Sequence, residues 1–202
     1  MVSPFESAVG GAVPARFDLA RILGQATRGN SMAKTGQGGG MAGTGLTVRP
    51  MRGDAGEIAA VVALIRGAFA EHLDRLDPPP SAVKETAESI TALLERETGL
   101  VAETGGVVVG CLFLQRRDGG DIYLGRVAVA RQHRRGGVGR ALIAAAEAEA
   151  RRLGARRLTL GVRLALDGNR RFFASLGFAE GALHAHPGYD KPTWVEMTKT
   201  IA

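Results

Sequence analysis

The chain has 202 residues, of which 45% are hydrophobic and 23% are charged, and this size and composition indicate one globular domain with or without a tail. Its formal net charge of +6 favours anionic partners, and the absence of any run of about 18 apolar residues argues against a membrane span. The single cysteine, Cys111, excludes a disulfide framework within the chain and suits a reducing compartment, so we expect a cytoplasmic protein.

Residues 1–45 differ from the rest of the chain. They have few periodic apolar positions and end in a glycine-rich run from Gly36 to Gly45, a composition that supports neither a helix nor a strand. We expect a disordered N-terminal tail or a mis-called start, with Met41 as the true first residue; a targeting peptide is the alternative. The domain proper is expected to span residues 46–202.

Hydrophobic periodicity predicts a strand at Leu46–Met51, followed by two helices. Asp54 and Glu57 have the spacing of a capping box, and apolar residues then recur at helical spacing as far as Phe69. This helix must end before residues 78–80, because no helix continues through three prolines. The second helix is predicted over the segment that carries Ile90, Leu93 and Leu94.

Alternating apolar residues and glycine turns predict the remaining elements. The expected strands are Leu100–Glu103, Val107–Gln115, Asp121–Val129, Leu158–Val162, Phe178–Ala185 and Thr193–Thr200. A short helix is expected at Gly168–Leu176, and a long one ends at Gly154 with a buried stripe of Val138, Ala141, Leu142, Ala145 and Ala148. This order indicates an α+β or mixed α/β sheet rather than a regular doubly wound one.

The segment Val127–Arg140 combines the end of an apolar strand, a basic glycine-rich turn and the start of an amphipathic helix. Glycines let a backbone approach a ligand closely, and the first turn of a helix adds unpaired N–H donors and the positive end of its dipole. Four arginines within ten residues add positive charge. The segment therefore predicts an anion site, most simply for a phosphate or pyrophosphate.

Two common nucleotide motifs do not fit this loop. The P-loop requires a lysine after its last glycine, and the chain has no lysine between Lys84 and Lys191. The dinucleotide fingerprint requires a third glycine, where this chain has Leu142. Both nucleotide readings are therefore excluded by the residues.

The pattern that fits is [QR]-x-x-G-x-[GA], which Arg134–Gly139 fills between a strand and a helix. In that context the segment resembles the coenzyme-A motif of the GNAT N-acetyltransferases. A second match lies at Asn169–Phe178, which is similar to the family's late helix ending in Leu-Gly-Phe. The resemblance covers about Leu46 to Lys199, and it implies a splayed, mostly antiparallel central sheet flanked by helices.

The resemblance also implies an acetyl-CoA site. Backbone groups of Val127–Val129 would bond the pantetheine arm, and backbone N–H groups from Arg135 to Arg140 would hold the pyrophosphate, with Arg134 beside them. Asn169 would lie near the pantetheine, although an N-cap role is an equal alternative. The implied donor-binding residues are Val127, Ala128, Val129, Arg134, Arg135, Gly136, Gly137, Val138, Gly139, Arg140, Asn169 and Phe173.

The chain departs from the family at Phe173, where a tyrosine often serves as general acid for the leaving thiolate. Tyr189 is the candidate that replaces it, and a purely structural turn at Pro187-Gly188 is the alternative. The side chain of Tyr123 faces either the cleft that a splayed sheet would leave for the thioester or the core. The residue types suited to a general base are carboxylates, and the sequence does not choose among Glu103, Asp121, Asp190 and Glu196.

These observations predict an acyl-CoA-dependent N-acyltransferase that transfers acetyl from acetyl-CoA to a primary amine by direct attack. The acceptor is a small molecule or a peptide, no metal site is expected, and the protein is a monomer or homodimer. One alternative is an acyl-CoA-binding domain without catalysis. The other is a nucleic-acid-binding domain that uses the basic cluster Arg151–Arg157, although interleaved aromatic residues are lacking.

Overall fold

The computed structural model describes residues 45–201, so the expectation for residues 1–45 lies outside them apart from Gly45. The elements are β1 (Leu46–Pro50), α2 (Ala55–Ala70), η1 (Ser81–Lys84), α3 (Ala87–Leu94), β2 (Thr98–Thr104), β3 (Val107–Arg116), β4 (Ile122–Val129), η2 (Arg131–His133), α4 (Val138–Arg152), β5 (Arg157–Arg163), α5 (Asp167–Ala174), β6 (Ala179–His184) and β7 (Trp194–Thr200). The predicted helices and strands appear in the predicted order, and the structure adds the two short 3₁₀ helices η1 and η2.

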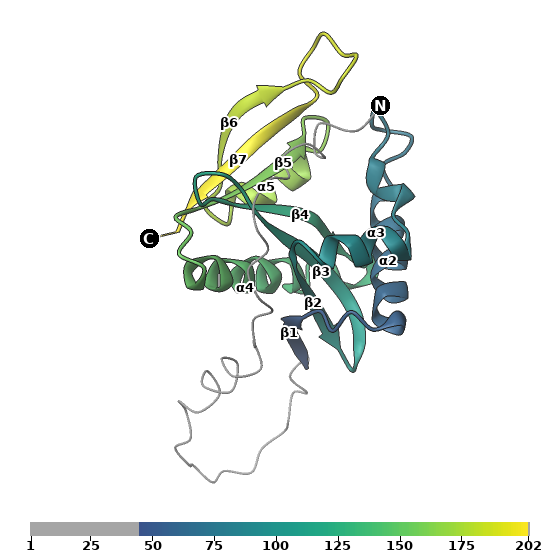
Figure 1. The fold of residues 1–202 in the computed structure, drawn as a ribbon. Coiled ribbons are helices and arrows are strands. Elements are labelled where there is room, and N and C mark those ends of the chain that lie inside the picture. Colours follow the sequence, from purple (N-terminus) through teal and green to yellow (C-terminus); the bar gives the residue numbers. More distant parts are fainter. Residues whose placement is uncertain (1–44, 202) are drawn as a thin grey trace, which may run out of the picture.

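The strands form one seven-stranded sheet with the order β1-β2-β3-β4-β5-β7-β6 (Figure 1). Every neighbouring pair is antiparallel except β4 and β5, which are parallel. Parallel neighbours need a crossover connection, and here α4 supplies it. The expectation of a mostly antiparallel sheet flanked by helices is therefore confirmed.

Helices cover the two faces of the sheet, with α2 and α3 on one face and α4 on the other (Figure 1). The first core lies under α2 and α3, where Val61 and Ile65 pack with Phe113. The second lies under α4 and includes Leu142. Among residues 45–201, no helix is both long and apolar enough to cross a membrane.

The buried face of α4 differs in part from the predicted stripe. Ala146 and Ala150 are buried, whereas Ala148 is exposed and Ala145 is only partly buried. The prediction was wrong for Ala148 because this helix carries alanines on several faces. A small apolar side chain does not by itself mark the side that packs against the sheet.

Side-chain caps fix where the first helices begin. The carboxylate of Asp54 accepts a hydrogen bond from the backbone N–H of Glu57 at 2.9 Å, which satisfies one of the unpaired donors at the start of α2. Glu57 in turn accepts from the N–H of Gly53 at 2.9 Å and pairs with Arg49 at 2.6 Å. These contacts tie the start of α2 to β1.

The sheet splits between β4 and β5. Their ladder contains only two registers among the described residues, Ile122 with Leu158 and Tyr123 with Thr159. On its other side β4 stays paired with β3, but the register shifts by one residue around Arg126, whose backbone is left-handed with φ 51°. Such a bulge bends a strand. Past Tyr123, therefore, β4 leaves β5 and exposes an edge.

The close packing of α4 on β3 generates a stability prediction. A Cβ added at Gly110 would lie 2.8 Å from Cγ1 of Val138 and 2.9 Å from Cδ1 of Leu142, so Gly110→Ala overpacks this contact. We expect a loss of about 1–3 kcal/mol in the free energy of unfolding, measured by denaturant titration. The matched control is Gly67→Ala on the exposed side of α2, where nothing lies within 4 Å. There the change should be neutral or stabilising by up to about 1 kcal/mol.

Candidate functional site

The predicted anion loop lies at the N-terminus of α4. Gly137 is the N-cap with φ 85°, Arg135 is also left-handed with φ 63°, and no side chain among the described residues caps the helix. The backbone N–H groups of the first turn of α4 are therefore not capped, and the positive end of the helix dipole adds to their pull on an anion. Arg135 and Arg140 are exposed, whereas the side chain of Val138 is buried, so Val138 can offer only its backbone.

The two sequence motifs are in contact. Gly139, in the first turn of α4, faces the ring of Phe172 from α5, and a Cβ added there would lie 3.0 Å from Cζ of Phe172. A larger residue would push the two helices apart. The small residue of the loop motif thus sets how closely the late helix approaches the anion loop.

The edge of β4 beside this loop is the segment Val127–Val129. Ala128 and Val129 pair with β3, while on the β5 side the ladder has already ended at Tyr123. This edge has the geometry needed to accept another extended chain through backbone hydrogen bonds. The structure therefore places the predicted arm-binding strand and the predicted anion loop side by side in the chain and in space.

Cys111 lies on β3 behind this edge and is fully buried. Its thiol donates to the carbonyl oxygen of Arg126 at 3.7 Å. Burial raises the pKa of the Cys111 thiol to about 12. The residue is thus a core side chain that stays protonated, and it supports the bulge rather than supplying a nucleophile.

An open hollow of about 300 Å³ lies between the C-terminal end of α2 and the start of α5. His72 and Arg75 line one side, and Asn169 and Arg171 line the other. The pKa of His72 lies below its ordinary value because the ring is partly buried, so at neutral pH it is mostly uncharged. The N-cap of α5 is Leu166, so the N-cap alternative for Asn169 is wrong, and Asn169 instead lines the hollow.

Arg134 makes contacts within the protein that the sequence did not predict. Its guanidinium makes two hydrogen bonds of 2.9 Å to the carboxylate of Glu71, just after α2, and Nε donates to the carbonyl oxygen of Val129 at 3.1 Å. The hydrogen bonds from Arg134 lower the pKa of Glu71. Arg134 thus links the anion loop to α2, and the backbone of the loop remains the main source of donors for an anion.

The two aromatic residues considered for proton transfer have distinct environments. Phe173 is buried, and its ring makes edge-to-face contacts with Phe172 and Phe178, so it belongs to the core rather than to the hollow. Tyr189 lies in the β6–β7 loop, where its hydroxyl donates to the carboxylate of Asp77, and this hydrogen bond raises the tyrosine pKa. Asp77 also accepts through its backbone oxygen from Arg163 at 2.7 Å.

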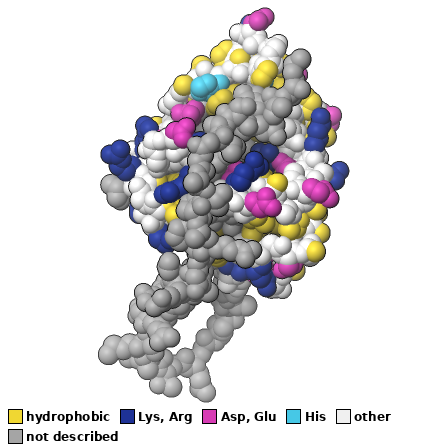
Figure 2. All heavy atoms as spheres, viewed as in Figure 1, with side chains coloured by type: hydrophobic (Ala, Val, Ile, Leu, Met, Phe, Trp, Pro, Cys, Tyr) yellow, Lys and Arg dark blue, Asp and Glu magenta, His cyan; other side chains and the backbone are white. Residues whose placement is uncertain are grey.

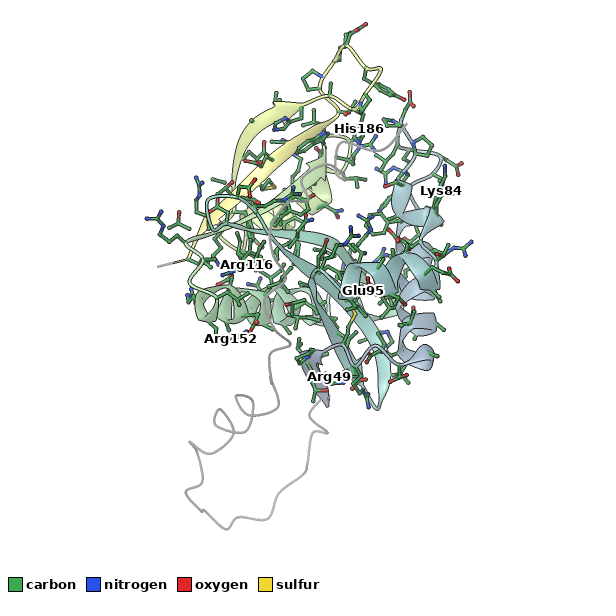
Figure 3. All side chains as sticks on the ribbon, viewed as in Figure 1. Arg49, Lys84, Glu95, Arg116, Arg152 and His186 are labelled. Carbon is green, nitrogen blue, oxygen red and sulfur yellow. The ribbon has the colours of Figure 1, made fainter. Side chains whose placement is uncertain are left out.

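These contacts join the β6–β7 loop to the segment between α2 and η1. Figure 3 agrees with this contact: the loop that carries His186 extends toward the part of the chain that leads to Lys84, at the end of η1. Asp190, one of the proposed bases, is exposed in that loop. Two other carboxylates serve ion pairs instead, since Glu103 bonds Arg49 at 3.1 Å and Asp121 pairs with Arg157 at 2.6 Å.

Two acidic residues near the bulge were not identified as site residues from the sequence. Glu85 is buried at the end of η1 and pairs with Nε of Arg126 at 2.6 Å. Glu97 precedes β2, and burial raises its pKa while the charge of Arg126 opposes that shift. Nothing in the local sequence marks either residue, because both depend on where the bulge brings Arg126.

A site with an open strand edge, an adjacent anion loop and a hollow between α2 and α5 suits an extended ligand that carries phosphate, as an acyl-coenzyme A does. The sequence model of the acetyltransferase (GNAT) family matches residues 60–178, which is more than half of the chain. The chain therefore belongs to the GNAT acetyltransferase family. The general activity that goes with this membership is acetyl-CoA-dependent acyl transfer, with acetyl-CoA as the donor.

Solved structures share the fold. A protein from Klebsiella pneumoniae assigned as an acyl-CoA N-acyltransferase is 25% identical, with a TM-score of 0.57 over 79% of this chain and 100% of its own. The ribosomal-protein-S18-alanine N-acetyltransferase from Escherichia coli is 20% identical, with a TM-score of 0.59 over 78% and 94%. The PaiA N-acetyltransferase from Thermoplasma acidophilum, solved with coenzyme A, is 15% identical, with a TM-score of 0.64 over 77% and 98%. No curated protein matches the chain at a significant level.

The left-handed Gly137 generates a binding prediction. Gly137→Val forces a β-branched residue into a conformation that costs about 1–2 kcal/mol, so the loop relaxes and its N–H groups turn away. We expect coenzyme-A affinity to fall about tenfold or more by calorimetry, with cooperative melting retained. Gly119→Val is the matched control, because Gly119 has φ 84° and open space but lies in the β3–β4 turn. Equal affinity in both variants would contradict this assignment of the loop.

Proposed function

We propose that the protein is an N-acyltransferase that transfers an acetyl group from acetyl-CoA to a primary amine by direct attack. The observation that carries this proposal is the separation of β4 from β5 beside the anion loop. A thioester arm laid along Val127–Val129 reaches the fork between the strands. At this point an amine can approach the carbonyl carbon of the thioester from the face of the sheet that α2 and α3 cover.

In this proposal the chain binds the donor mainly through its backbone. The N–H groups of residues 135–140 hold the pyrophosphate, and the edge of Val127–Val129 aligns the pantetheine arm. Asn169 contacts that arm from the start of α5, where it lines the hollow beside α2. Binding through many backbone groups fixes the position of the thioester, and positioning alone can supply a large part of the rate enhancement.

Direct attack is favoured over a covalent enzyme intermediate. The chain has one cysteine, and its thiol is buried with a pKa of about 12, so it supplies no thiolate at neutral pH. The amine nitrogen therefore attacks the thioester itself. The acceptor is proposed to be a small molecule or a peptide amine in the cytoplasm, acted on by a monomer or a homodimer.

The nucleic-acid alternative loses support from the ion pairs. In the basic cluster, Arg152 pairs with Glu149 at 2.5 Å and Arg157 with Asp121 at 2.6 Å, so much of its positive charge is neutralised. On the face shown in Figure 2, acidic side chains are interspersed with the basic ones. A nucleic-acid site would instead need a continuous basic surface to contact successive phosphates.

The proposed function is tested by binding and turnover together. We expect saturable binding of coenzyme A by calorimetry, and release of free thiol from acetyl-CoA that depends on at least one member of a panel of primary amines. Gly137→Val should lose both, whereas Gly119→Val should keep both. Saturable binding without turnover on any amine would favour the non-catalytic alternative. Salt-sensitive retention on DNA that coenzyme A does not displace would favour the nucleic-acid alternative.

A further inference from the structure

The hollow between α2 and α5 contains positive charge that the proposed contact of Asn169 does not use. Arg75 lines it on the α2 side and Arg171 on the α5 side, and both residues are exposed. Among residues 45–201, neither guanidinium makes an ion pair or a side-chain hydrogen bond. The neighbouring Arg170, in contrast, pairs with a glutamate at 2.8 Å. Two guanidiniums with unused donors therefore line one open volume.

Little in the hollow offsets this positive charge. Asp167 is the only carboxylate among its lining residues, and it bonds Arg170 at 3.0 Å while its side chain stays 67% exposed to solvent. Burial lowers the pKa of His72, and the positive charge of Arg75 adds to that shift, so the ring is mostly uncharged at neutral pH. The electrostatic field in the hollow is therefore set by the two arginines and favours an anion.

Both sides of the hollow are joined to the anion loop. On the α2 side, Glu71 bonds Arg134 of the loop at 2.9 Å. On the α5 side, Arg171 directly precedes Phe172, whose ring would lie 3.0 Å from a Cβ added at Gly139. The hollow therefore lies beside the start of α4. A ligand that is bound there by a pyrophosphate can place a second charged group in the hollow.

The chemistry of the guanidinium narrows the kind of anion. Its planar set of N–H donors matches the paired oxygens of a carboxylate or a phosphate, and charge-assisted hydrogen bonds of this type are stronger than neutral ones. A phosphate monoester offers three acceptor oxygens. It can therefore accept hydrogen bonds from arginines on two opposite sides at once.

Resting on the proposed function, which places a pyrophosphate on the loop, we infer that the hollow is a second anion site in which Arg75 and Arg171 hold the oxygens of a phosphate monoester or a carboxylate. Two groups in the reaction have this chemistry. One is the 3′-phosphate of coenzyme A, on the ribose that also carries the pyrophosphate. The other is an anionic group of the acceptor. Either occupant makes the two arginines specificity-determining residues.

The test titrates inorganic phosphate into the complex with dephospho-coenzyme A, which keeps the pyrophosphate and lacks only the 3′-phosphate. In this complex the loop is filled and the hollow is open. We expect saturable binding of phosphate by phosphorus NMR. Arg75→Gln and Arg171→Gln should each weaken it about fivefold or more, because each removes a charge-assisted contact.

The matched control is Arg156→Gln. Arg156 is also exposed and makes no ion pair or side-chain hydrogen bond within the described part of the chain. It directly precedes β5, whereas the hollow lies beyond the other end of that strand, at residues 165–171. This variant removes the same charge at a distance and should bind phosphate as the wild type does. Cooperative melting of all three variants checks that they are folded.

The same titration with coenzyme A identifies the occupant. If it is the 3′-phosphate, coenzyme A blocks the binding of inorganic phosphate. The wild type then binds coenzyme A about tenfold more tightly than the dephospho form, and Arg171→Gln reduces this preference. If the occupant belongs to the acceptor, phosphate binds both complexes alike. The two variants then raise KM for amines that carry a carboxylate and not for amines without one. Both results support the second anion site.

Other outcomes separate this inference from the proposed function. A wild type that binds neither form of the coenzyme contradicts the proposed function, and the inference with it. Normal binding of dephospho-coenzyme A without saturable binding of phosphate overturns the inference alone. Phosphate binding that is unchanged in Arg75→Gln and Arg171→Gln, or weakened equally in Arg156→Gln, also rejects it, because the two arginines then have no specific part in holding the anion.

Discussion

The early separation of β4 from β5 is the constraint on which the rest of the site depends. The ladder ends at Tyr123, and three residues further on comes the bulge around Arg126, whose left-handed backbone costs about 1–2 kcal/mol in a residue with a side chain. Three contacts support that conformation: pairing of the flanking residues with β3, the hydrogen bond from Cys111, and the ion pair with Glu85. The strained residue thus lies in the part of β4 that is paired with β3 but not with β5, where the two halves of the sheet separate.

The loops around the fork are linked to one another rather than independent. Arg134 joins the anion loop to the end of α2 through Glu71, and Asp77 joins the next part of the chain to Tyr189 and Arg163. The segment after α2 is therefore attached to the loop before α4 at one point, and to the β6–β7 loop and β5 at another. A ligand that displaces this segment would therefore also pull on the loop before α4, through the contact between Glu71 and Arg134.

The sequence predicted the elements whose signals are local. Glycines, prolines and caps marked the ends of the helices and strands, and the loop motif led us to predict an anion site in the segment that the structure shows at the start of α4. Contacts between residues far apart in the chain could not be predicted from local signals. The contact of Arg134 with Glu71, which lies 63 residues away, is one example. Tyr123 shows the same limit, because the sequence does not indicate that the β4–β5 ladder ends at this residue, opposite Thr159.

The burial of Cys111 also affects how the chemistry of this protein can be observed. Because the only cysteine is inside the core and stays protonated, the native chain contributes no reactive sulfur to a thiol-sensitive dye. Any colour that develops with the folded protein comes from the coenzyme alone. The same dye becomes a probe of unfolding once denaturant exposes β3, since each opened molecule then adds one equivalent of sulfhydryl. The burial of Cys111 thereby allows one dye to report the formation of free coenzyme A with the folded protein and the loss of structure with the unfolded protein.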